Sequence, residues 1–336
     1  MEKDNLYMSR ALELAKLGAG NVSTNPMVGA VVVCDNKIIG EGYHRKYGCP
    51  HAEVNAVASV KEESLFSRST MYVTLEPCSH FGKTPPCCDL LIRKGFKRVV
   101  VAMQDPFALV AGEGIRRMRE AGLTVDVGVM EKEALFLNRR FVTFNTLKRP
   151  YVIIKYARTT DGFIDNDRES STPATWLTGY PAKALVHRWR AEEDAIMVGT
   201  NTVLRDNPEL TVREWTGKNP LRVTMDKRDR IPSTAKIING EADTVVFTHH
   251  SLSQIFDDLY KRGVQSIMVE GGRALINNIV TLGLYDEVRE FVSPLRLSDL
   301  KGGRGGDGIR APQIHNLKLL SSREVGKDVK LNIFIK

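Results

Sequence analysis

Three short motifs in the first half of the chain carry residue types that bind metal ions and move protons. They are His51-Ala52-Glu53, Pro77-Cys78 and Pro85-Pro86-Cys87-Cys88. One neutral imidazole and two thiolates leave the fourth tetrahedral position of a zinc ion for water, which is the pattern of a catalytic rather than a structural zinc site. The motifs therefore predict a zinc centre that holds a water molecule.

The order of these motifs is close to the zinc nucleobase-deaminase signature H-x-E … P-C-x-x-C, with eight residues between the cysteines instead of two. Zinc lowers the pKa of its water toward about 7, which gives a hydroxide nucleophile at neutral pH. A carboxylate that is not a ligand must take the proton of that water and deliver it to the departing ammonia. Glu53 fits this role. The chemistry that these residues suggest is hydrolytic deamination.

The spacing of His51 and Glu53 also locates the metal relative to the predicted helices. Residues two apart on a helix point about 200° apart. The ion must therefore lie beyond the helix end, with His51 in the first turn and the longer Glu53 reaching over it. A second helix opens at Cys87, and the partial positive charge of both helix starts favours thiolate over thiol.

Each motif alone has a more ordinary interpretation. An isolated His-x-Glu usually begins a surface helix, and an adjacent cysteine pair usually belongs to a core. Their joint occurrence in this order, with prolines before the cysteines, favours zinc. Spacing does not decide between Cys87 and Cys88 as the ligand. We interpret Cys34 as structural, and Cys49 lies near the metal in sequence without an assigned role.

The elements that position these motifs alternate along the first half. Apolar residues at helical spacing predict helices at 6–17, 51–60, 87–94 and 113–121. Apolar and β-branched runs predict strands at 28–33, from 38 onward, 70–75, 97–103 and 123–129. A hairpin followed by β-α-β-α-β predicts a three-layer α/β/α domain with a partly parallel sheet.

Lys148-Arg149-Pro150 interrupts the pattern, because proline removes a donor and disfavours helix in the residue before it. We therefore predict two domains, residues 1–147 and 148–336. The second is again α/β, with a helix at 252–262 that Ser251 caps and Gly263 ends. Strands are predicted from 151 and at 195–199, 221–226, 244–248, 266–270 and 287–293.

Composition excludes several classes of protein. The chain has 336 residues, of which 42% are hydrophobic and 26% charged, as in ordinary globular proteins. No apolar run approaches the roughly 18 residues that span a bilayer, and five cysteines do not suit a disulfide scaffold. A reducing, cytoplasmic location is the default expectation. The net charge of +8 suits a phosphorylated substrate as well as nucleic acid, and a solvated basic surface is the more ordinary explanation.

By spacing alone, the second half indicates less chemistry. A strand followed by Gly271-Gly272-Arg273 and a helix can bring backbone N–H groups onto a phosphate, although a plain tight turn has the same pattern. The glycine-rich segment 302–308 is interpreted as a mobile surface loop. Trp176 and Trp189 are typical of a core. No residue of this half stands out as a general acid.

Segments across the chain resemble the bifunctional riboflavin-biosynthesis deaminase–reductases. The segments that resemble the family's deaminase half are TNPMVGAVVV (24–33), HAEVNAV (51–57), YVTLEPCSHFGKTPPC (72–87) and DPFALVAGEGI (105–115). The segments that resemble the family's reductase half are KYARTTDGFID (155–165), TWLTG (175–179), VHRWRAEEDAIMVGTNTVLRDNPELTVR (186–213) and VEGGRAL (269–275). The resemblance implies a cytidine-deaminase-like domain, then a dihydrofolate-reductase-like domain, with Zn²⁺ and NADPH as cofactors.

For the deaminase half, the resemblance implies Cys87 as the ligand beside His51 and Cys78, because the family places it directly after Thr-Pro-Pro. The implied substrate is 2,5-diamino-6-(5-phosphoribosylamino)pyrimidin-4-one. The family positions that line its pocket correspond to Asn25, His44, His80, Lys83, Thr84 and Asp105. Phe107 stands where the family often has Asn, so one contact is not carried over.

For the reductase half, the resemblance implies hydride transfer from NADPH to the ribose C1′, which opens the sugar to a ribityl chain. The family's NADPH positions correspond to Ala157, Trp176, Thr202, Asp206, Gly272, Arg273 and Ala274. Its substrate positions correspond to Arg190, Leu210, Arg213 and Glu270. The planar donor forks of Arg190 and Arg213 suit a phosphate, and Glu270 could accept hydrogen bonds from sugar or base.

Without the resemblance, Arg190 would be read as a helix-surface residue and Arg213 as flanking a turn. Two positions depart from the family, Ala174 in place of a frequent substrate-binding Ser and Lys227 in place of a small polar residue. Substrate contact at 174 is therefore not expected.

The sequence thus predicts a bifunctional enzyme that acts on a small phosphorylated pyrimidine, without nucleic acid or membrane as a partner. A nucleic-acid base-editing deaminase would need a basic groove with interleaved aromatic residues, yet aromatics make up only 7% of the chain. A zinc-stabilised binding module would need a fourth protein ligand, and three are evident. The sequence is compatible with a homo-oligomer and does not fix the oligomeric state.

Overall fold

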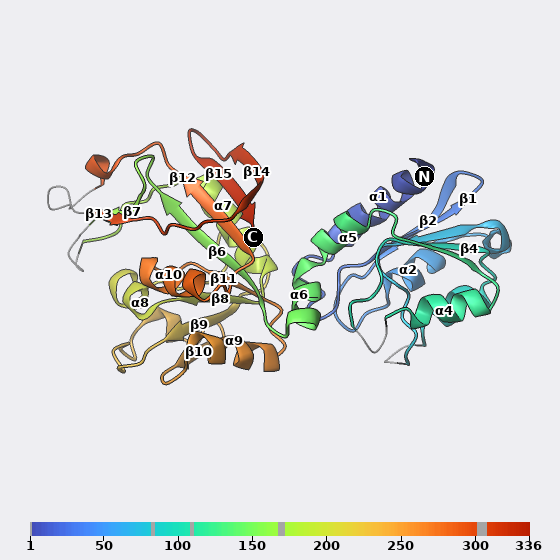
Figure 1. Cartoon of the computed structure of the whole chain (residues 1–336), viewed down its shortest axis with the longest axis horizontal. Helices are drawn as coiled ribbons and strands as arrows, with labels where there is room; N and C mark the ends of the chain where they lie inside the picture. The colour runs from blue at the N-terminus through green and yellow to red at the C-terminus, as the bar shows by residue number, and fades with distance from the viewer. Residues whose placement is uncertain (1, 82–84, 108–110, 167–171, 301–307) are drawn as a thin grey trace. The chain divides into compact units, whose positions relative to one another are not determined.

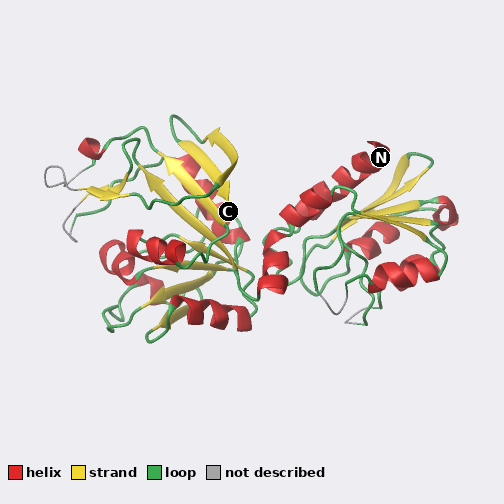
Figure 2. Cartoon of the chain, viewed as in Figure 1, coloured by secondary structure: helices red, strands yellow, loops and turns green. Residues whose placement is uncertain are grey.

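The computed structural model describes residues 2–81, 85–107, 111–166, 172–300 and 308–336. The chain divides into two compact units, Met1–Lys148 and Arg149–Lys336, each with its own sheet (Figures 1 and 2). At the division, Lys148 adopts a left-handed backbone conformation with φ of 55°. The two units are described separately.

The first unit is built on a five-stranded sheet in the order β2-β1-β3-β4-β5. Along the chain these strands are β1 Gly29–Cys34, β2 Lys37–Tyr43, β3 Thr70–Val73, β4 Arg98–Val101 and β5 Thr124–Val127. The helices are α1 Glu2–Lys16, α2 Ala52–Ala58, α3 Cys87–Arg93, α4 Glu113–Glu120, α5 Glu131–Leu137 and α6 Arg139–Leu147, with a 3₁₀ turn at Glu63–Arg68. Strand β1 is antiparallel to β2 and β3, whereas β3, β4 and β5 are parallel.

Helices cover both faces of this sheet. A Cβ atom on Gly29 would lie 2.0 Å from a backbone oxygen of α1, and one on Gly42 would lie 2.3 Å from a backbone nitrogen of α2. Because Gly42 pairs with Ala30 and not with Gly29, the two glycines face opposite sides of the sheet. Helices α1 and α2 therefore pack closely on opposite faces. The predicted three-layer α/β/α fold with a partly parallel sheet is confirmed.

The second unit contains an eight-stranded sheet in the order β10-β9-β8-β11-β6-β12-β15-β14. Its strands are β6 Tyr151–Arg158, β8 Ala195–Val198, β9 Leu221–Met225, β10 Thr244–Phe247, β11 Ser266–Val269, β12 Glu287–Val292, β14 Lys318–Glu324 and β15 Lys330–Ile335. Strands β7 Phe163–Asn166 and β13 Gly308–Arg310 form a separate pair. The helices are α7 Tyr180–Glu192, α8 Thr200–Asp206, α9 Leu252–Lys261 and α10 Arg273–Thr281, with 3₁₀ turns at Lys236–Ile238 and Leu297–Asp299.

Alternating residues of the parallel strands bury themselves under different helices. Val152 and Ile154 of β6 pack with α9 and α10, whereas Tyr151 and Ile153 pack with α7 and α8. Helix α9 begins as predicted, with Ser251 and Gln254 forming a capping box. Strand β8 leads directly into α8 and its neighbour β11 leads into α10, so both helices start at the same edge of the sheet.

The two tryptophans that were assigned to a core behave differently. Trp189 is buried and packs against Phe291, as expected. The assignment of Trp176 to a core is wrong, because its side chain is 71% exposed. Of the glycine-rich segment 302–308, only Gly308 lies within the described residues, where it begins β13.

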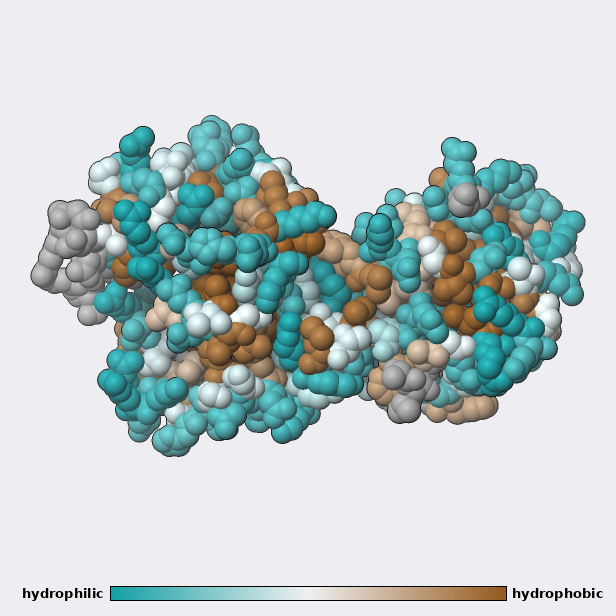
Figure 3. Space-filling model, in the orientation of Figure 1, coloured by the Kyte–Doolittle hydropathy of each residue, from teal (hydrophilic) through white to brown (hydrophobic). Residues whose placement is uncertain are grey.

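Hydrophilic residues cover most of the face shown in Figure 3 in both units. Within the described ranges, the chain forms no helix that combines the length and the apolar character needed to cross a membrane.

Candidate active sites

The predicted zinc ligands of the first unit converge on one point. His51 immediately precedes α2, Cys87 is the first residue of α3, and Cys78 lies in the loop after β3. The Nδ1 atom of His51 lies 3.6 Å from the Cys78 sulfur and 3.4 Å from the Cys87 sulfur. All three ligand atoms lie within 4.8 Å of one another.

These distances test whether the donor set fits zinc. Tetrahedral zinc bonds of about 2.0 Å to nitrogen and 2.3 Å to sulfur place the two ligand atoms about 3.6 Å apart. The separations between the His51 nitrogen and the two sulfurs agree with this value. One imidazole and two sulfurs are also the ligand types that zinc prefers. The three residues therefore fit a zinc ion with a fourth position left for water.

In this cluster the Cys78 sulfur is the one prepared for ionisation, because Cys87 shares its thiol proton with Cys78 and this hydrogen bond, together with burial, raises the pKa of Cys87. Hydrogen bonds from Cys87 and from His51 lower the pKa of the Cys78 thiol to about 4. One of these bonds comes from the backbone N–H of Cys87, at 3.3 Å, at the start of α3. Burial raises the pKa of the Cys88 thiol to about 11, and its sulfur turns to Asp89 at 3.6 Å. Of the adjacent pair, only Cys87 faces the cluster.

We expect Cys87→Ser to remove zinc and Cys88→Ser to retain it. Loss of an outer-shell partner alone weakens metal binding about 10–100-fold, and loss of a ligand should cost more. Elemental analysis of the purified full chain measures the zinc content of each variant. NADPH oxidation with deaminated substrate is the control that the second unit is intact. Equal zinc content in the two variants would show that Cys87 is not a ligand.

Glu53 lies over this cluster without joining it. Its side chain is 3% exposed and hydrogen-bonds the Cys87 sulfur. Burial, together with the nearby Cys78 thiolate, raises the pKa of Glu53 to about 7. A carboxyl with a pKa near neutrality can both accept and release a proton at physiological pH. The geometry therefore suits a proton carrier next to a metal-bound ligand position.

Asn25 and His44 lie beside the cluster, with the His44 ring centroid 5.5 Å from that of His51. The His44 Nδ1 atom lies 3.2 Å from the Pro50 carbonyl oxygen, which can only accept, so this nitrogen carries the proton. Its Nε2 atom then accepts a hydrogen bond from the Asn25 amide at 3.0 Å. His44 is 2% exposed, and burial lowers its pKa. His44 is thus a neutral imidazole, and its hydrogen bond orients the Asn25 amide.

The remaining predicted pocket residues of this unit are spread over two loops. His80 is exposed, and Asp105 is half-buried with its carboxylate accepting the Phe107 N–H at 2.9 Å. Burial raises the pKa of Asp105, and the nearby His80 opposes this shift. Lys83 and Thr84 lie outside the described residues. Cys49 is exposed and does not belong to the cluster of ligand atoms.

Sequence reasoning missed Glu76, which is buried two residues before Cys78. Its two carboxylate oxygens accept four backbone N–H groups at 2.9–3.3 Å, two per oxygen. The donors are Asp105, Gly112, Gly114 and Ile115. Glu76 therefore ties the loop that carries Asp105, and the start of α4, to the zinc-site loop. Its position between an apolar strand and the Pro-Cys motif was the available signal.

We expect Glu76→Gln to destabilise the first unit although the side chain keeps its size. The new amide NH₂ would face two backbone donors, and each buried donor left unpaired costs about 1–3 kcal/mol. The free energy of unfolding of this unit should fall by at least about 2 kcal/mol, so deamination should be lost at a lower temperature than in wild type. All three tryptophans lie in the second unit, so unchanged tryptophan-monitored unfolding is the control. An unaltered inactivation curve would contradict the role.

The second unit contains a cavity of about 1220 Å³ at the edge where α8 and α10 begin. Every residue that the resemblance placed at an NADPH or substrate position lines this cavity. The NADPH positions are Ala157, Trp176, Thr202, Asp206, Gly272, Arg273 and Ala274. The substrate positions are Arg190, Leu210, Arg213 and Glu270. Residues as far apart in the sequence as 157 and 274 thus line the same cavity.

The cofactor end of the cavity is a backbone cradle. A Cβ atom on Gly271 would lie 2.9 Å from the backbone nitrogen of Gly199, so the turns that start α8 and α10 touch each other. The Gly272 N–H donates to the Thr202 hydroxyl at 3.1 Å, and no side chain caps α10. Helix N-termini that lack a covering side chain can receive phosphate groups. This end therefore fits the pyrophosphate of a dinucleotide such as NADPH.

At the substrate end, Glu270 is paired with two cations. Arg190 donates to both carboxylate oxygens at 2.9 Å, and the Lys155 ammonium lies 3.2 Å from one of them. Burial alone would raise the pKa of Glu270, but the two cations hold it well below its usual range. Lys155, which sequence reasoning also missed, is a polar residue in the otherwise apolar start of β6.

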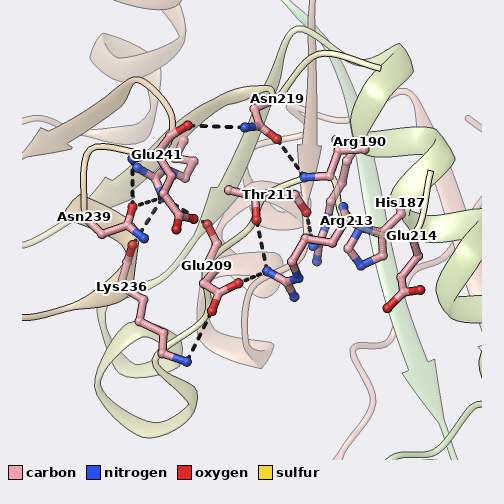
Figure 4. Close-up of polar contacts among 12 residues, drawn as sticks. His187, Arg190, Glu209, Thr211, Arg213, Glu214, Asn219, Lys236, Asn239 and Glu241 are labelled. Atoms are coloured by element: carbon pink, nitrogen blue, oxygen red, sulfur yellow. Dashed lines mark hydrogen bonds and ion pairs between the residues drawn. The ribbon is translucent and has the colours of Figure 1, made fainter. Parts of the chain in front are cut away.

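This pairing changes two sequence-based interpretations. Arg190 is not a solvated helix-surface residue, because its side chain is only 11% exposed. Its donor fork is turned toward Glu270, and one further N–H donates to the Thr211 carbonyl at 3.2 Å. Arg213 instead points to Glu209 and to the Thr211 hydroxyl, as Figure 4 shows. Both arginines are thus paired with a carboxylate, but the Arg213 side chain is 46% exposed and is the more accessible of the two to a phosphate.

Leu210 is buried against this end in an unusual conformation. Its φ angle is 57° and its side chain is 3% exposed. A residue other than glycine in the left-handed region costs about 1–3 kcal/mol and persists only where neighbouring contacts hold it. Such strain is typical of binding sites.

Comparison with known proteins covers both units. Residues 1–103 match the cytidine and deoxycytidylate deaminase zinc-binding region, and residues 150–331 match the RibD C-terminal domain. The riboflavin biosynthesis protein RibD of Aquifex aeolicus is 40% identical, with 100% of this chain and 99% of that protein covered. These matches span both predicted activities in the predicted order.

Solved structures agree with the sequence comparisons. Acinetobacter baumannii RibD superposes with a TM-score of 0.89 at 32% identity, covering 100% of this chain and 99% of that one. The diaminohydroxyphosphoribosylaminopyrimidine deaminase/5-amino-6-(5-phosphoribosylamino)uracil reductase of Thermotoga maritima gives 0.88 at 36% identity, covering 99% of each. The chain therefore belongs to the RibD family of bifunctional riboflavin-biosynthesis enzymes, with a zinc-binding deaminase domain followed by an NADPH-using reductase domain.

Proposed function

We propose that this chain performs two consecutive steps on one phosphorylated pyrimidine. Residues 1–147 would deaminate 2,5-diamino-6-(5-phosphoribosylamino)pyrimidin-4-one, and residues 148–336 would reduce its ribosyl group to a ribityl chain. The observation that carries this proposal is that the three zinc-fitting donors lie under a buried Glu53 whose pKa is near neutrality. The Thermotoga relative named for both activities supports the choice of substrate.

In the deaminase step, His51, Cys78 and Cys87 would hold the zinc ion. Zinc in this position lowers the pKa of a water molecule toward about 7. Glu53 takes a proton from the attacking water and passes it to the amino group of the pyrimidine. The C–O bond forms first, which makes the ring carbon tetrahedral, and the C–N bond then breaks as the protonated amino group leaves as ammonia. Asn25 and Asp105 orient the ring during this exchange.

In the reductase step, bound NADPH would supply the hydride for the ribose C1′. The turns at Gly199 and Gly271-Gly272 would hold its pyrophosphate, and Arg213 would meet the substrate phosphate. When the bond between C1′ and the ring oxygen breaks, that oxygen needs a proton, and the Lys155 ammonium donates it. Glu270 keeps Lys155 in place.

The proposed partner is a small molecule only, and neither nucleic acid nor a membrane takes part. We also propose a cytoplasmic location. The cluster works only with reduced sulfurs, and all five cysteines are free thiols. A reducing compartment maintains that state.

One assay of the purified full chain tests both steps. Zinc, the diaminopyrimidinone phosphate and NADPH are supplied together, and ammonia and NADPH absorbance are followed in parallel. Ammonia release should precede NADPH oxidation, and chelation of zinc should stop both. Addition of deaminated substrate should then restore NADPH oxidation alone. NADPH oxidation without any ammonia release would refute the proposed order, and the absence of both would refute the function.

A further inference from the structure

Arg222, in strand β9, is a fully buried cation whose hydrogen bonds all go to uncharged groups. Its side chain is 0% exposed. It donates to Thr244 Oγ1 at 2.9 Å, the Glu209 carbonyl at 3.2 Å, the Lys236 carbonyl at 3.2 Å, Asn239 Oδ1 at 3.0 Å and the Ala242 carbonyl at 2.6 Å. Burial of a charge is costly, and these five hydrogen bonds, with the nearby carboxylates of Glu241 and Asp243, offset that cost.

The bonds of Arg222 join the substrate end of the cavity to the β9–β10 connection. Most of its acceptors lie between residues 236 and 244, whereas Glu209 belongs to the separate segment that runs to Arg213. Glu209, Leu210 and Arg213 all line the cavity. Arg222 itself does not line it, so it can act on a ligand only through these residues.

The hydrogen bond from Arg222 to the Glu209 carbonyl constrains the backbone of residues 209–213, three of which line the substrate end of the cavity. That carbonyl and the N–H of Leu210 belong to one rigid peptide plane. A hydrogen bond that fixes the carbonyl therefore fixes the plane from which Leu210 enters its left-handed conformation, with φ of 57°. Without this hold, Leu210 would relax toward an ordinary φ angle and change the direction of the chain that follows.

Two other side chains hold the rest of the segment. Asn219 accepts the Val212 N–H at 2.8 Å, and His187 accepts the Arg213 N–H at 3.0 Å. Figure 4 shows Asn219 and His187 flanking the segment, with the Glu209 side chain between Arg213 and Lys236. Among the described residues, the hydrogen bond to the Glu209 carbonyl comes from Arg222.

We propose that Arg222 is a positioning residue of the reductase site that sets the binding of the pyrimidine substrate and not of NADPH. It holds Leu210 and Arg213 at the substrate end, and it makes no hydrogen bond to Gly271, Gly272 or Thr202 at the cofactor end. This inference rests on the proposed function of the second unit.

The test is Arg222→Met in the full chain, with three readouts. The KM for the deaminated pyrimidine should rise about 10–100-fold, the range for hydrogen bonds to a charged group. The Kd for NADPH should stay within about twofold of wild type, and kcat/KM for deamination should not change. Arg262→Met is the matched control, because Arg262 is a half-exposed arginine directly after α9 that pairs with Asp258. It should change none of the three.

Two milder variants keep the test decisive if Arg222→Met does not fold. Arg222→Lys should restore part of the affinity, and Asn239→Ala, which removes one acceptor, should raise KM by a smaller factor. An unchanged KM in these folded variants, or an equal loss of NADPH and substrate binding, would overturn the inference. If wild type does not oxidise NADPH with deaminated substrate, the proposed function fails instead.

Discussion

Replacement of Glu53 by Gln is expected to abolish ammonia release while zinc stays bound. The amide keeps the size of the side chain but cannot take a proton from water. Loss of a general acid–base group costs about 10²–10⁴-fold in rate. Ammonia release at saturating substrate, zinc content by elemental analysis, and NADPH oxidation with deaminated substrate are measured on the same preparation. Only the first should fall.

A surface variant separates this effect from the loss of any carboxylate. Glu133 is exposed on α5, and Glu133→Gln should leave all three measurements unchanged. Should zinc disappear together with activity in Glu53→Gln, Glu53 would be a ligand or a structural support of the cluster. Retained ammonia release would exclude Glu53 as the proton carrier.

Replacement of Glu270 by Gln is expected to damage the second unit more than any other single change at its cavity. The side chains of Arg190 and Lys155 are only 11% and 17% exposed, and both would lose their opposite charge. Removal of one partner of a buried ion pair costs about 3–5 kcal/mol. Tryptophan fluorescence during denaturant unfolding reports this unit alone, because all three tryptophans lie in it. NADPH oxidation should be lost, whereas deamination continues.

The pH dependence of unfolding gives an independent check. Because the folded pKa of Glu270 is lowered, its contribution to stability is fully present above the unfolded value of about 4.3 and is lost as the pH falls below it. Glu270→Gln should remove this part of the acid sensitivity. Glu324→Gln, at an exposed position on β14, is the control. Equal stability and equal acid sensitivity in Glu270→Gln and wild type would mean that the pairing contributes nothing.

The zinc centre could be predicted because its residues are tied to local signals. A proline directly precedes His51, Cys78 and Cys87. Helices α2 and α3 begin directly after two of these prolines or one residue later. Spacing could not choose between Cys87 and Cys88. Successive residues of a helix point about 100° apart, so only one sulfur of the pair can face the ion. Which one does so depends on where α3 begins, and helix boundaries are the least certain feature of a sequence pattern.

The substrate end of the second cavity could not be predicted in detail from local patterns. Glu270 meets Lys155 and Arg190 across 115 and 80 residues of sequence. Arg190 therefore looked available for phosphate although a distant carboxylate occupies it. Strand β14 and helices α5 and α6 were also missed. All seven residues of β14 are exposed, so it lacks the alternation of buried and exposed residues that marks a strand.

The internal pairing around Glu270 leaves an electrical imbalance. Arg190 and Lys155 carry two positive charges against one negative charge, so 2 − 1 leaves +1 inside a partly enclosed space. A confined excess of one sign raises the local concentration of oppositely charged molecules before any contact forms. The trio thus attracts anions from a distance, and dissolved salt weakens that attraction by screening it.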